Sequence, residues 1–284
     1  MRHAHTLRVG PVAFRIGSDW RAPVVTLADL YAGFPAVDVP GLTVRLSAPR
    51  PWRRWLRPQV AIGGDLMLPG TVPLPLAHGL LAAEMAMNLQ VALGWRRHLL
   101  LHAAVVERDG AAVILTGESG AGKSTLAALL TARGWRLLGD EFALLSPDDG
   151  RLHPHPRLVS LKNESVAAVA AALPDARWGP WLRGTPKGVI RHLVPDATAR
   201  TGMDRPARPA AIVFPRFGAP SASRQVLPSE AFARLTTAST NYADLGEAGF
   251  AALTRLVREV PAVAIDYLDG GAGVAAVERL CDRR

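Results

Sequence analysis

One eight-residue stretch, Gly117-Glu118-Ser119-Gly120-Ala121-Gly122-Lys123-Ser124, constrains the fold of this chain more than any other feature. Apolar segments at 112–116 and 125–130 flank it, which predicts a strand, a loop and a helix in succession. The glycines let consecutive backbone N–H groups turn toward one point, where the start of the helix adds the positive end of its dipole. A Gly-x4-Gly-Lys-Ser stretch in this setting is typical of a loop that binds nucleotide phosphates, so the sequence predicts an α/β fold around such a loop.

The residues of this loop have separate expected roles. We expect Lys123 to reach the β- and γ-phosphates of ATP, and the Ser124 hydroxyl to bind Mg²⁺. The remaining contacts to the nucleotide are expected from Gly117, Ser119, Gly120, Ala121, Gly122 and Thr125. ATP and Mg²⁺ are therefore the predicted cofactors. The alternative is a chance match in a chain that contains 26 glycines.

Two consecutive carboxylates follow the loop. Asp140 ends a short apolar strand seventeen positions after Lys123, where we expect it to bind Mg²⁺ directly or through water. Glu141 offers a second carboxylate that is expected to accept the proton of an attacking hydroxyl. Neighbouring side chains of an extended segment point to opposite faces, so a bulge or turn must bring both carboxylates into one site. The alternative is an acidic turn after a strand.

Three further residues are candidates on position and composition. His102 lies in the apolar run 99–104, where a histidine serves either as a core residue or near reacting groups. Of 33 lysines and arginines only Lys123, Lys162 and Lys187 are lysines. An ammonium is a compact point charge and a guanidinium a planar fork, so the two are not interchangeable at a phosphate. We therefore predict site roles for Lys162 and Lys187, with retention of two surface lysines by chance as the alternative.

The net charge of +9 and the isoelectric point near 10.8 are typical of nucleic-acid binders, but the distribution of charge argues against that class. Up to residue 98 the chain has 11 basic and 5 acidic residues, and beyond it 22 and 19. The part that carries the phosphate loop is thus nearly balanced, and its arginines are spread along the chain. We predict no nucleic-acid partner.

The sequence predicts a cytoplasmic protein without a membrane segment. Charged residues interrupt the apolar runs near the N-terminus, unlike a signal peptide. No apolar stretch reaches the ~20 residues that span a bilayer. The single cysteine, Cys281, rules out an intramolecular disulfide. The arginine- and tryptophan-rich segment 50–57 is interpreted as a solvated edge with aromatic anchors, with a surface for an acidic peptide or a membrane as the alternative.

Composition and the pattern of apolar residues divide the chain into two parts. Residues 1–95 are rich in proline and glycine, with short β-like runs and a helix at about 76–95, and form a predicted β-rich N-terminal domain. Turns are expected at Gly10-Pro11, Pro40-Gly41 and Pro69-Gly70. Residues 96–284 alternate strand and helix patterns and form a predicted nucleotide-binding domain. Its expected strands are 99–106, 111–116, 135–138, 142–145, 189–193, 210–215 and 262–267, and its expected helices 124–133, 164–172, 229–235, 247–260 and 274–280.

With these residues in hand, the chain resembles the HPr kinase/phosphorylase family, in the branch called HprK-related kinase A. The resemblance covers about residues 76–284 and lies in Leu101-His102-Ala103-Ala104, Gly117 to Ser124, Gly139-Asp140-Glu141, Leu161-Lys162-Asn163-Glu164, Thr185-Pro186-Lys187-Gly188, Ile212-Val213-Phe214-Pro215 and Asn241-Tyr242. It implies a phosphate-loop core of the HPr kinase/phosphoenolpyruvate carboxykinase type over residues 96–284. It also implies a kinase that phosphorylates a serine hydroxyl, with His102 near the reacting groups and Glu141 as the base.

The chain departs from the family pattern at three places. Glu141 stands where the second aspartate of the family's pair falls, and Thr125 replaces an acidic residue that follows the loop in HPr kinases. No clear copy of the Glu-x-Arg-Gly segment is present. These departures argue against HPr itself as the acceptor and against the reverse phosphorolysis.

The sequence therefore predicts an ATP-dependent kinase acting on a peptide or small protein, and leaves open whether the chain is a homo-oligomer. A small-metabolite kinase and a non-catalytic ATP-sensing module are the alternatives. The retained pair Asp140 and Glu141 argues against the sensor, which needs no base. Motifs of transporter ATPases, guanine-selective proteins, zinc sites and serine hydrolases are missing from the sequence.

Overall fold

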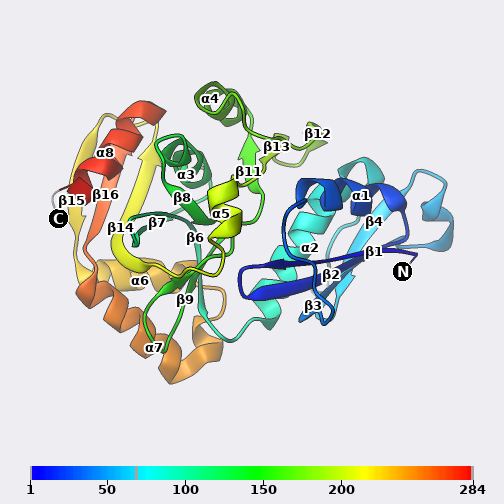
Figure 1. The fold of residues 1–284 in the computed structure, drawn as a ribbon, viewed down its shortest axis with the longest axis horizontal. Coiled ribbons are helices and arrows are strands. Elements are labelled where there is room, and N and C mark those ends of the chain that lie inside the picture. The colour runs from blue at the N-terminus through cyan, green and yellow to red at the C-terminus, as the bar shows by residue number, and fades with distance from the viewer. Residues whose placement is uncertain (1, 68–69, 283–284) are drawn as a thin grey trace.

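The computed structural model describes residues 2–67 and 70–282, so the turn expected at Pro69-Gly70 lies partly outside the described residues. The protein is a mixed α/β molecule whose strands form sheets of five, eight and three strands (Figure 1). The five-stranded sheet contains the N-terminal strands, and the other two contain the strands from β6 onward. The α/β class predicted from the sequence is confirmed at this level.

The five-stranded sheet has the order β1-β2-β3-β4-β5. Its strands are β1 (His3–Val9), β2 (Val12–Ser18), β3 (Leu42–Ser47), β4 (Gln59–Gly64) and β5 (Leu74–Pro75). The expected turn at Gly10-Pro11 joins β1 to β2, and a Cβ on Gly10 would lie 1.8 Å from the carbonyl oxygen of Pro154. Helix α1 (Arg21–Leu30) joins β2 to the parallel strand β3, because parallel neighbours need such a crossover.

Helix α2 (Gly79–Gly94) follows a short 3₁₀ turn, η2 (Leu76–His78), and packs on the five-stranded sheet. The helix expected at about 76–95 is thus confirmed. By length and composition alone, Leu76–Gly94 is apolar enough to cross a membrane, with a mean hydropathy of 1.2. However, 61% of that window is buried inside the fold, as in the core helix of a soluble protein.

The eight-stranded sheet carries the phosphate-loop sequence. Its strands are β6 (Leu99–Arg108), β7 (Ala111–Thr116), β8 (Arg136–Gly139), β9 (Phe142–Leu145), β10 (Leu152–His153), β14 (Arg208–Phe217), β15 (Ala222–Val226) and β16 (Ala262–Tyr267). Strands β7, β14 and β16 are parallel neighbours, so their carboxyl ends meet at one edge. Helices α3 (Lys123–Thr131) and α8 (Gly270–Asp282) cover one face, and α6 (Pro228–Ala238) and α7 (Tyr242–Glu259) the other (Figure 1).

The three-stranded sheet lies beside α3 and has the order β11-β13-β12. Its strands are β11 (Val159–Lys162), β12 (Leu182–Thr185) and β13 (Gly188–Leu193), with α4 (Glu164–Ala172) following β11. The lysines predicted as site residues both belong to this unit, Lys162 at the end of β11 and Lys187 in the β12–β13 turn.

The N-terminal sheet and the rest of the chain share buried contacts. Leu100, Phe142 and Leu144 belong to the same apolar cluster as the N-terminal strands. In addition, the buried Arg157 guanidinium donates to the Glu84 carboxylate at 2.5 Å, and the Tyr31 hydroxyl donates to Glu84 at 3.0 Å. The division into domains at 95/96 stays a prediction, because side chains from both parts pack in one shared apolar cluster.

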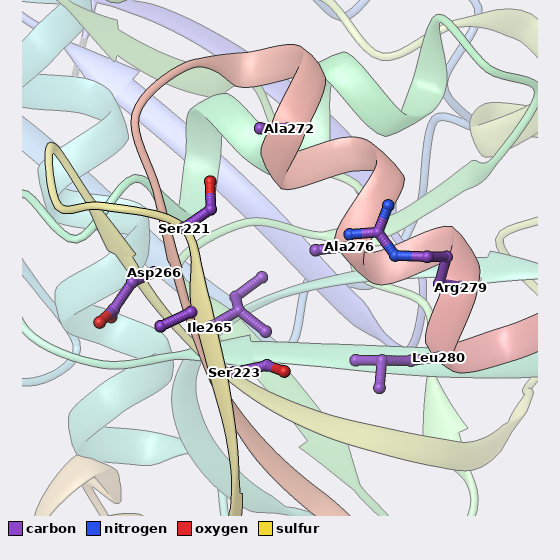
Figure 2. A pocket seen from close by; sticks show the side chains of 9 residues that line it. Ser221, Ser223, Ile265, Asp266, Ala272, Ala276, Arg279 and Leu280 are labelled. Atoms are coloured by element: carbon purple, nitrogen blue, oxygen red, sulfur yellow. The ribbon is translucent and has the colours of Figure 1, made fainter.

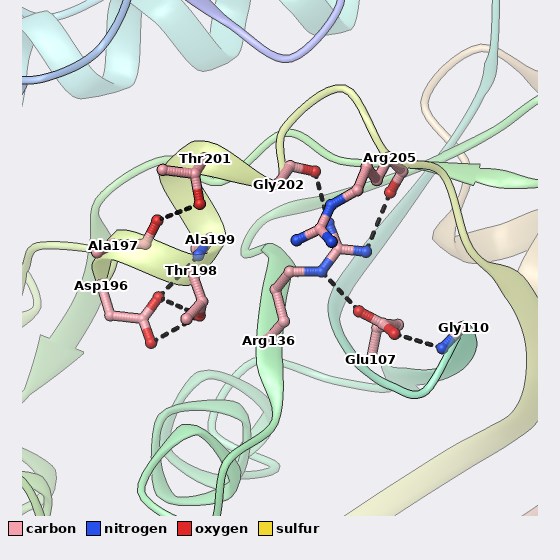
Figure 3. Close-up of polar contacts among 10 residues, drawn as sticks. All are labelled: Glu107, Gly110, Arg136, Asp196, Ala197, Thr198, Ala199, Thr201, Gly202 and Arg205. Atoms are coloured by element: carbon pink, nitrogen blue, oxygen red, sulfur yellow. Dashed lines mark hydrogen bonds and ion pairs between the residues drawn. The ribbon is translucent and has the colours of Figure 1, made fainter.

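A polar anchor fixes the strand that leads to Asp140 (Figure 3). The Arg136 guanidinium, on β8, donates to the Glu107 carboxylate at 2.6 Å and to the carbonyls of Gly202 and Arg205 at 2.6 and 3.0 Å. Helix α5 (Ala197–Thr201) lies nearby, and the Asp196 carboxylate caps its first turn by accepting from the backbone of Ala199 (Figure 3). These contacts tie β8 to the chain that runs from α5 to β14.

The segment 50–57 corrects one expectation. Pro51–Arg54 form a 3₁₀ turn, η1, and Trp52 and Trp55 are 51% and 74% exposed. The tryptophans therefore do not anchor this edge. Instead Arg50 lies over the ring of Trp52, and Arg54 over the ring of Trp55.

Candidate active site

The phosphate-loop sequence forms the connection between β7 and α3, at the edge where the parallel strands end. Gly117, Gly120 and Gly122 have φ of +150°, +89° and +93°, the region that favours glycine. A Cβ on Gly122 would lie 2.4 Å from the Tyr267 hydroxyl oxygen, whereas nothing lies within 4 Å of one on Gly120. The loop thus packs closely against Tyr267 at Gly122 and is open to solvent at Gly120.

Lys123 lies folded against the loop. Its ammonium donates to the carbonyl oxygens of Gly117 at 2.7 Å and Glu118 at 2.9 Å, and the residue is only 8% exposed. Burial lowers the pKa of Lys123, while the carboxylates of Asp140 and Glu141 act in the opposite direction. The ammonium is therefore held at the loop by two neutral acceptors, which an anionic ligand can replace.

The Asp140 carboxylate contacts the first turn of α3. The Ser124 hydroxyl donates to its Oδ1 at 2.9 Å, so the two predicted metal ligands are side by side. The residue is 3% exposed, and its Oδ2 is buried without a hydrogen-bond partner. Burial, together with the neighbouring Glu141 charge, raises the pKa of Asp140 to about 7, against the hydrogen bonds from Ser124 and the backbone of Ser160.

Glu141 adopts a left-handed backbone conformation, with φ of +79°. It lies in the turn between β8 and β9, which supplies the break in the extended chain that two consecutive carboxylates require. Its carbonyl oxygen accepts hydrogen bonds from the backbone of Ala103 at 3.3 Å and from His102 Nδ1 at 3.1 Å. A left-handed glutamate is energetically unfavourable by roughly 1–2 kcal/mol, and such strain concentrates at functional sites.

His102 contacts the Glu141 turn and also lines the groove beside the 117–121 segment of the loop. It lies on β6 opposite Phe142, and its Nδ1 is 3.5 Å from the Glu141 carboxylate. Burial lowers the pKa of His102; Glu141 opposes this shift, and Lys123 and Lys162 add to it. Because a carbonyl oxygen only accepts, Nδ1 carries the proton in its bond to Glu141, which leaves Nε2 as an acceptor in the neutral ring.

The two other predicted lysines lie in different settings. Lys162 is close enough to affect the pKa values of His102, Lys123 and Asp140, so the structure brings it to the cluster. Lys187 is exposed at the tip of the β12–β13 hairpin and is not among the main influences on those groups. Asn163 links the two segments through hydrogen bonds with the backbone of Val189 at 2.9 and 3.0 Å. The role of Lys187 stays a prediction.

The donor set fits Mg²⁺. Among residues 2–67 and 70–282 no cluster of three or more His, Cys, Asp or Glu side chains is arranged to hold a metal by itself. Mg²⁺, however, is usually held by one or two carboxylates, waters and the phosphates of the substrate. The unpartnered Oδ2 of Asp140 and the adjacent Ser124 hydroxyl provide this incomplete set of hard oxygen ligands.

A groove of about 1170 Å³ runs along one side of the 117–124 loop. His102 and the loop residues 117–121 line one end, and the ends of β14, β15, β16 and α6 line the rest. Three arginines in its lining, Arg216, Arg224 and Arg234, were not identified from the sequence, nor was Tyr267 beneath the loop. They come from separate elements and belong to no local motif.

A second cavity, of about 410 Å³, lies between β15, β16 and α8 (Figure 2). Its lining includes Ser221, Asp266 and Arg279, and none of the site residues predicted from the sequence. This cavity is therefore separate from the loop and the Asp140–Glu141 turn, although it shares Asp266 with the groove.

The similarity of this chain to known proteins is limited in extent. A family model described as "SynChlorMet cassette protein ScmC" matches residues 81–168, a span of under a third of the chain that includes His102, the phosphate loop, Asp140, Glu141 and Lys162. No curated protein matches the sequence. One similar solved structure is the Hpr(Ser) kinase/phosphatase from Coxiella burnetii, at 15% identity over 65% of this chain and 99% of that chain. Its TM-score is 0.30, too low to support a structural argument.

Proposed function

We propose that this chain is an ATP-dependent kinase that transfers the γ-phosphoryl group to a serine hydroxyl of a peptide or small protein. The observation that carries the proposal is Asp140, whose buried carboxylate accepts from Ser124 through one oxygen and leaves the other unpartnered at the start of the loop helix. A carboxylate in this state is suited to an incoming cation. We place the protein in the cytoplasm as part of this proposal, where ATP is supplied.

In the proposed reaction the acceptor oxygen attacks the γ-phosphorus, the bond from that phosphorus to the β–γ bridging oxygen breaks, and ADP leaves. The loop N–H groups bind the phosphates, and Lys123 exchanges its two carbonyl acceptors for phosphate oxygens. Ser124 and Asp140 would hold Mg²⁺, which would supply positive charge beside the phosphates. Glu141 takes the proton of the hydroxyl, and Lys162 adds a second cation beside the cluster.

The left-handed turn at Glu141 serves this role because it lets adjacent carboxylates act on different groups. Asp140 is directed to the start of α3, and Glu141 is next to His102 at the end of the groove. His102, whose Nδ1 is bound to the Glu141 carbonyl, positions this turn.

The test is transfer of label from γ-labelled ATP by the purified chain to lysate proteins and to products of neighbouring genes, read by mass spectrometry. Label on a polypeptide supports the proposal, and label on a small molecule only supports the metabolite kinase instead. Tight ATP binding without any turnover supports the sensing module.

Variants of Lys123 complete this test. We expect Lys123→Ala and Lys123→Arg both to abolish transfer without changing the thermal unfolding profile, since a planar fork does not replace the ammonium. Arg133→Ala, at an exposed position beyond the end of α3, is the matched control and should transfer normally. Full activity of Lys123→Ala would overturn the proposal.

A further inference from the structure

The groove beside the loop has a floor made of three neighbouring strands. The register aligns Phe214 of β14 with Ala264 of β16, and Ala264 with Arg224 of β15. Two residues further along β14 and β16, Arg216 aligns with Asp266, and Asp266 aligns with Ala222 of β15. Residues two apart on a strand share a face, so all six side chains project into the groove. Because Ala222 and Ala264 have small side chains, they leave space in the floor between the Phe214 ring and the two arginines, Arg216 and Arg224.

Helix α6 forms the wall of the groove and adds a third guanidinium. Arg234 and Thr237 are three positions apart on this helix and both line the groove, followed by the hydroxyl-bearing Ser239 and Thr240. Arg234 lies over the Phe214 ring at 4.8 Å, which orients its guanidinium toward the floor. The volume of about 1170 Å³ exceeds the roughly 300–1,000 Å³ of pockets that enclose a drug-sized molecule, so the groove accommodates a segment of chain.

The charges at this end of the groove are incompletely paired. Arg224 and Arg234 both donate to one carboxylate, that of Glu230, at 2.6 Å each, while Arg216 is paired with Asp266. Each guanidinium has five N–H donors, so a single shared carboxylate leaves donors of both arginines free. The ion pairs are also exposed, and exposed pairs contribute only about 0–1 kcal/mol, so an incoming carboxylate displaces or joins them readily.

The opposite end of the groove is the reacting end. His102 and the loop residues 117–121 line it, and His102 Nδ1 is 3.5 Å from the Glu141 carboxylate. Glu118 places a negative charge there, so the positive excess of the groove lies on the α6 side, away from the loop. A polypeptide whose serine reaches His102 and Glu141 therefore extends over the floor toward Arg224 and Arg234.

We propose that this groove binds the acceptor, and that Arg224 and Arg234 select a polypeptide segment with an acidic side chain near the serine that is phosphorylated. The inference rests on the proposed kinase function and adds the class of substrate. Arg224 and Arg234 are specificity-determining residues in this proposal. They bind the flank of the acceptor, and Glu141 acts on its hydroxyl.

The experiment uses the full chain and three amidated synthetic peptides with one serine, flanked by acidic, neutral amide or basic side chains. Amidation ensures that only side chains supply carboxylates. We expect kcat/KM to be at least about 10-fold higher for the acidic peptide than for the neutral one, because hydrogen bonds to charged groups are worth about 1.5–3 kcal/mol. The double variant R224Q/R234Q should raise KM for the acidic peptide to the value for the neutral peptide.

The control is Arg279→Gln, an arginine that lines the second cavity (Figure 2) and not the groove. It should keep the acidic preference unchanged. The substituted arginines of the groove are 53% and 40% exposed, so the double variant is expected to fold, which its thermal unfolding and nucleotide affinity report.

A binding measurement separates failure of this inference from failure of the kinase proposal. A fluorescent form of the acidic peptide is titrated with the chain in the presence of a non-hydrolysable ATP analogue. Binding that R224Q/R234Q weakens, without transfer of phosphate, supports the groove and overturns the kinase. Equal phosphorylation of acidic and neutral peptides, or an acidic preference that the double variant retains, supports the kinase and overturns the groove.

Discussion

The two sides of the 117–124 loop differ in how their charged residues are buried and paired. On the side of Asp140 two charged residues are buried, since Lys123 and Asp140 are 8% and 3% exposed, and the second oxygen of Asp140 has no partner. On the side of the groove the arginines are exposed and every one of Arg216, Arg224 and Arg234 is ion-paired. The first side holds a buried acceptor without a partner, and the second holds exposed arginines whose carboxylate partners leave some of their donors free.

If the chain is the proposed kinase, this difference suits the side of Asp140 to chemistry and the side of the groove to recognition. Charges in a site shielded from water interact strongly with developing charge, and their pKa values shift. Exposed ion pairs are weak, so they exchange partners with little loss of stability. His102 lies at the border, since it contacts the Glu141 turn and also lines the groove.

The largest expected effect tests whether the enclosed side carries the chemistry. Glu141→Gln removes the proposed base but keeps its length, so we expect kcat to fall by about 10²–10⁴-fold, the usual contribution of general base catalysis. Nucleotide affinity, measured by titration calorimetry, should be retained. Glu247→Gln, the same change at an exposed position of α7, is the control. Turnover within a few-fold of normal in Glu141→Gln would assign the base to another residue.

A smaller effect, on stability, tests how enclosed Asp140 is. Its pKa of about 7 in the fold lies above the ordinary value of 3.8, so the folded protein binds more protons than the unfolded chain between these values. The stability associated with this carboxyl group is therefore present below about pH 4 and lost as pH rises through 7. In urea unfolding without Mg²⁺, wild-type stability relative to Asp140→Asn should decrease from pH 5 to pH 8.

Two comparisons sharpen the Asp140 prediction. Mg²⁺ with ATP should stabilise the wild type at pH 8 and not Asp140→Asn, because a ligand stabilises only the state that binds it. Glu230, the ion-pair partner of Arg224 and Arg234, should show the opposite sign. Its bond with Arg224 lowers its pKa, so its contribution to stability is lost as pH falls through that lowered value. A pH-independent difference between wild type and Asp140→Asn would contradict the enclosed carboxylate.

Much of the enclosed side is foreseeable from the sequence, because its signals are local. The loop is a contiguous pattern between a strand and a helix, and Asp140 follows a short apolar run. The need for a turn at Asp140-Glu141 also follows from strand geometry, and the structure contains it as the left-handed Glu141. Rarity of lysine, in contrast, did not separate Lys162, which lies at the cluster, from the exposed Lys187.

The groove is not foreseeable, because its residues meet only through long-range pairing. Arg216 and Asp266 are fifty positions apart and become neighbours through the parallel pairing of β14 and β16. The strand β15, which contributes Arg224, has a polar and exposed sequence that gives no strand signal. Helix α1 was missed for a local reason, since its N-terminus has no side-chain cap.

The smallest expected effect concerns backbone strain, which also distinguishes the two sides. Among the described residues, non-glycine positions with positive φ are Arg57, Asp109, Glu141 and Asn163, and the groove strands contribute none. Glycine adopts this conformation without the steric penalty, although it loses more entropy on folding. We expect Glu141→Gly to raise the free energy of unfolding by up to about 1 kcal/mol while turnover is lost.

Asp109→Gly is the matched control for Glu141→Gly, because Asp109 has φ of +55° in the β6–β7 turn, away from the site. Aspartate tolerates the left-handed region better than glutamate, so Asp109→Gly should gain less stability than Glu141→Gly and retain full turnover. Both are measured by urea unfolding and label transfer. If Glu141→Gly were instead less stable than the wild type, contacts of the glutamate side chain would outweigh the strain, and the turn would be held by those contacts and not by its surroundings.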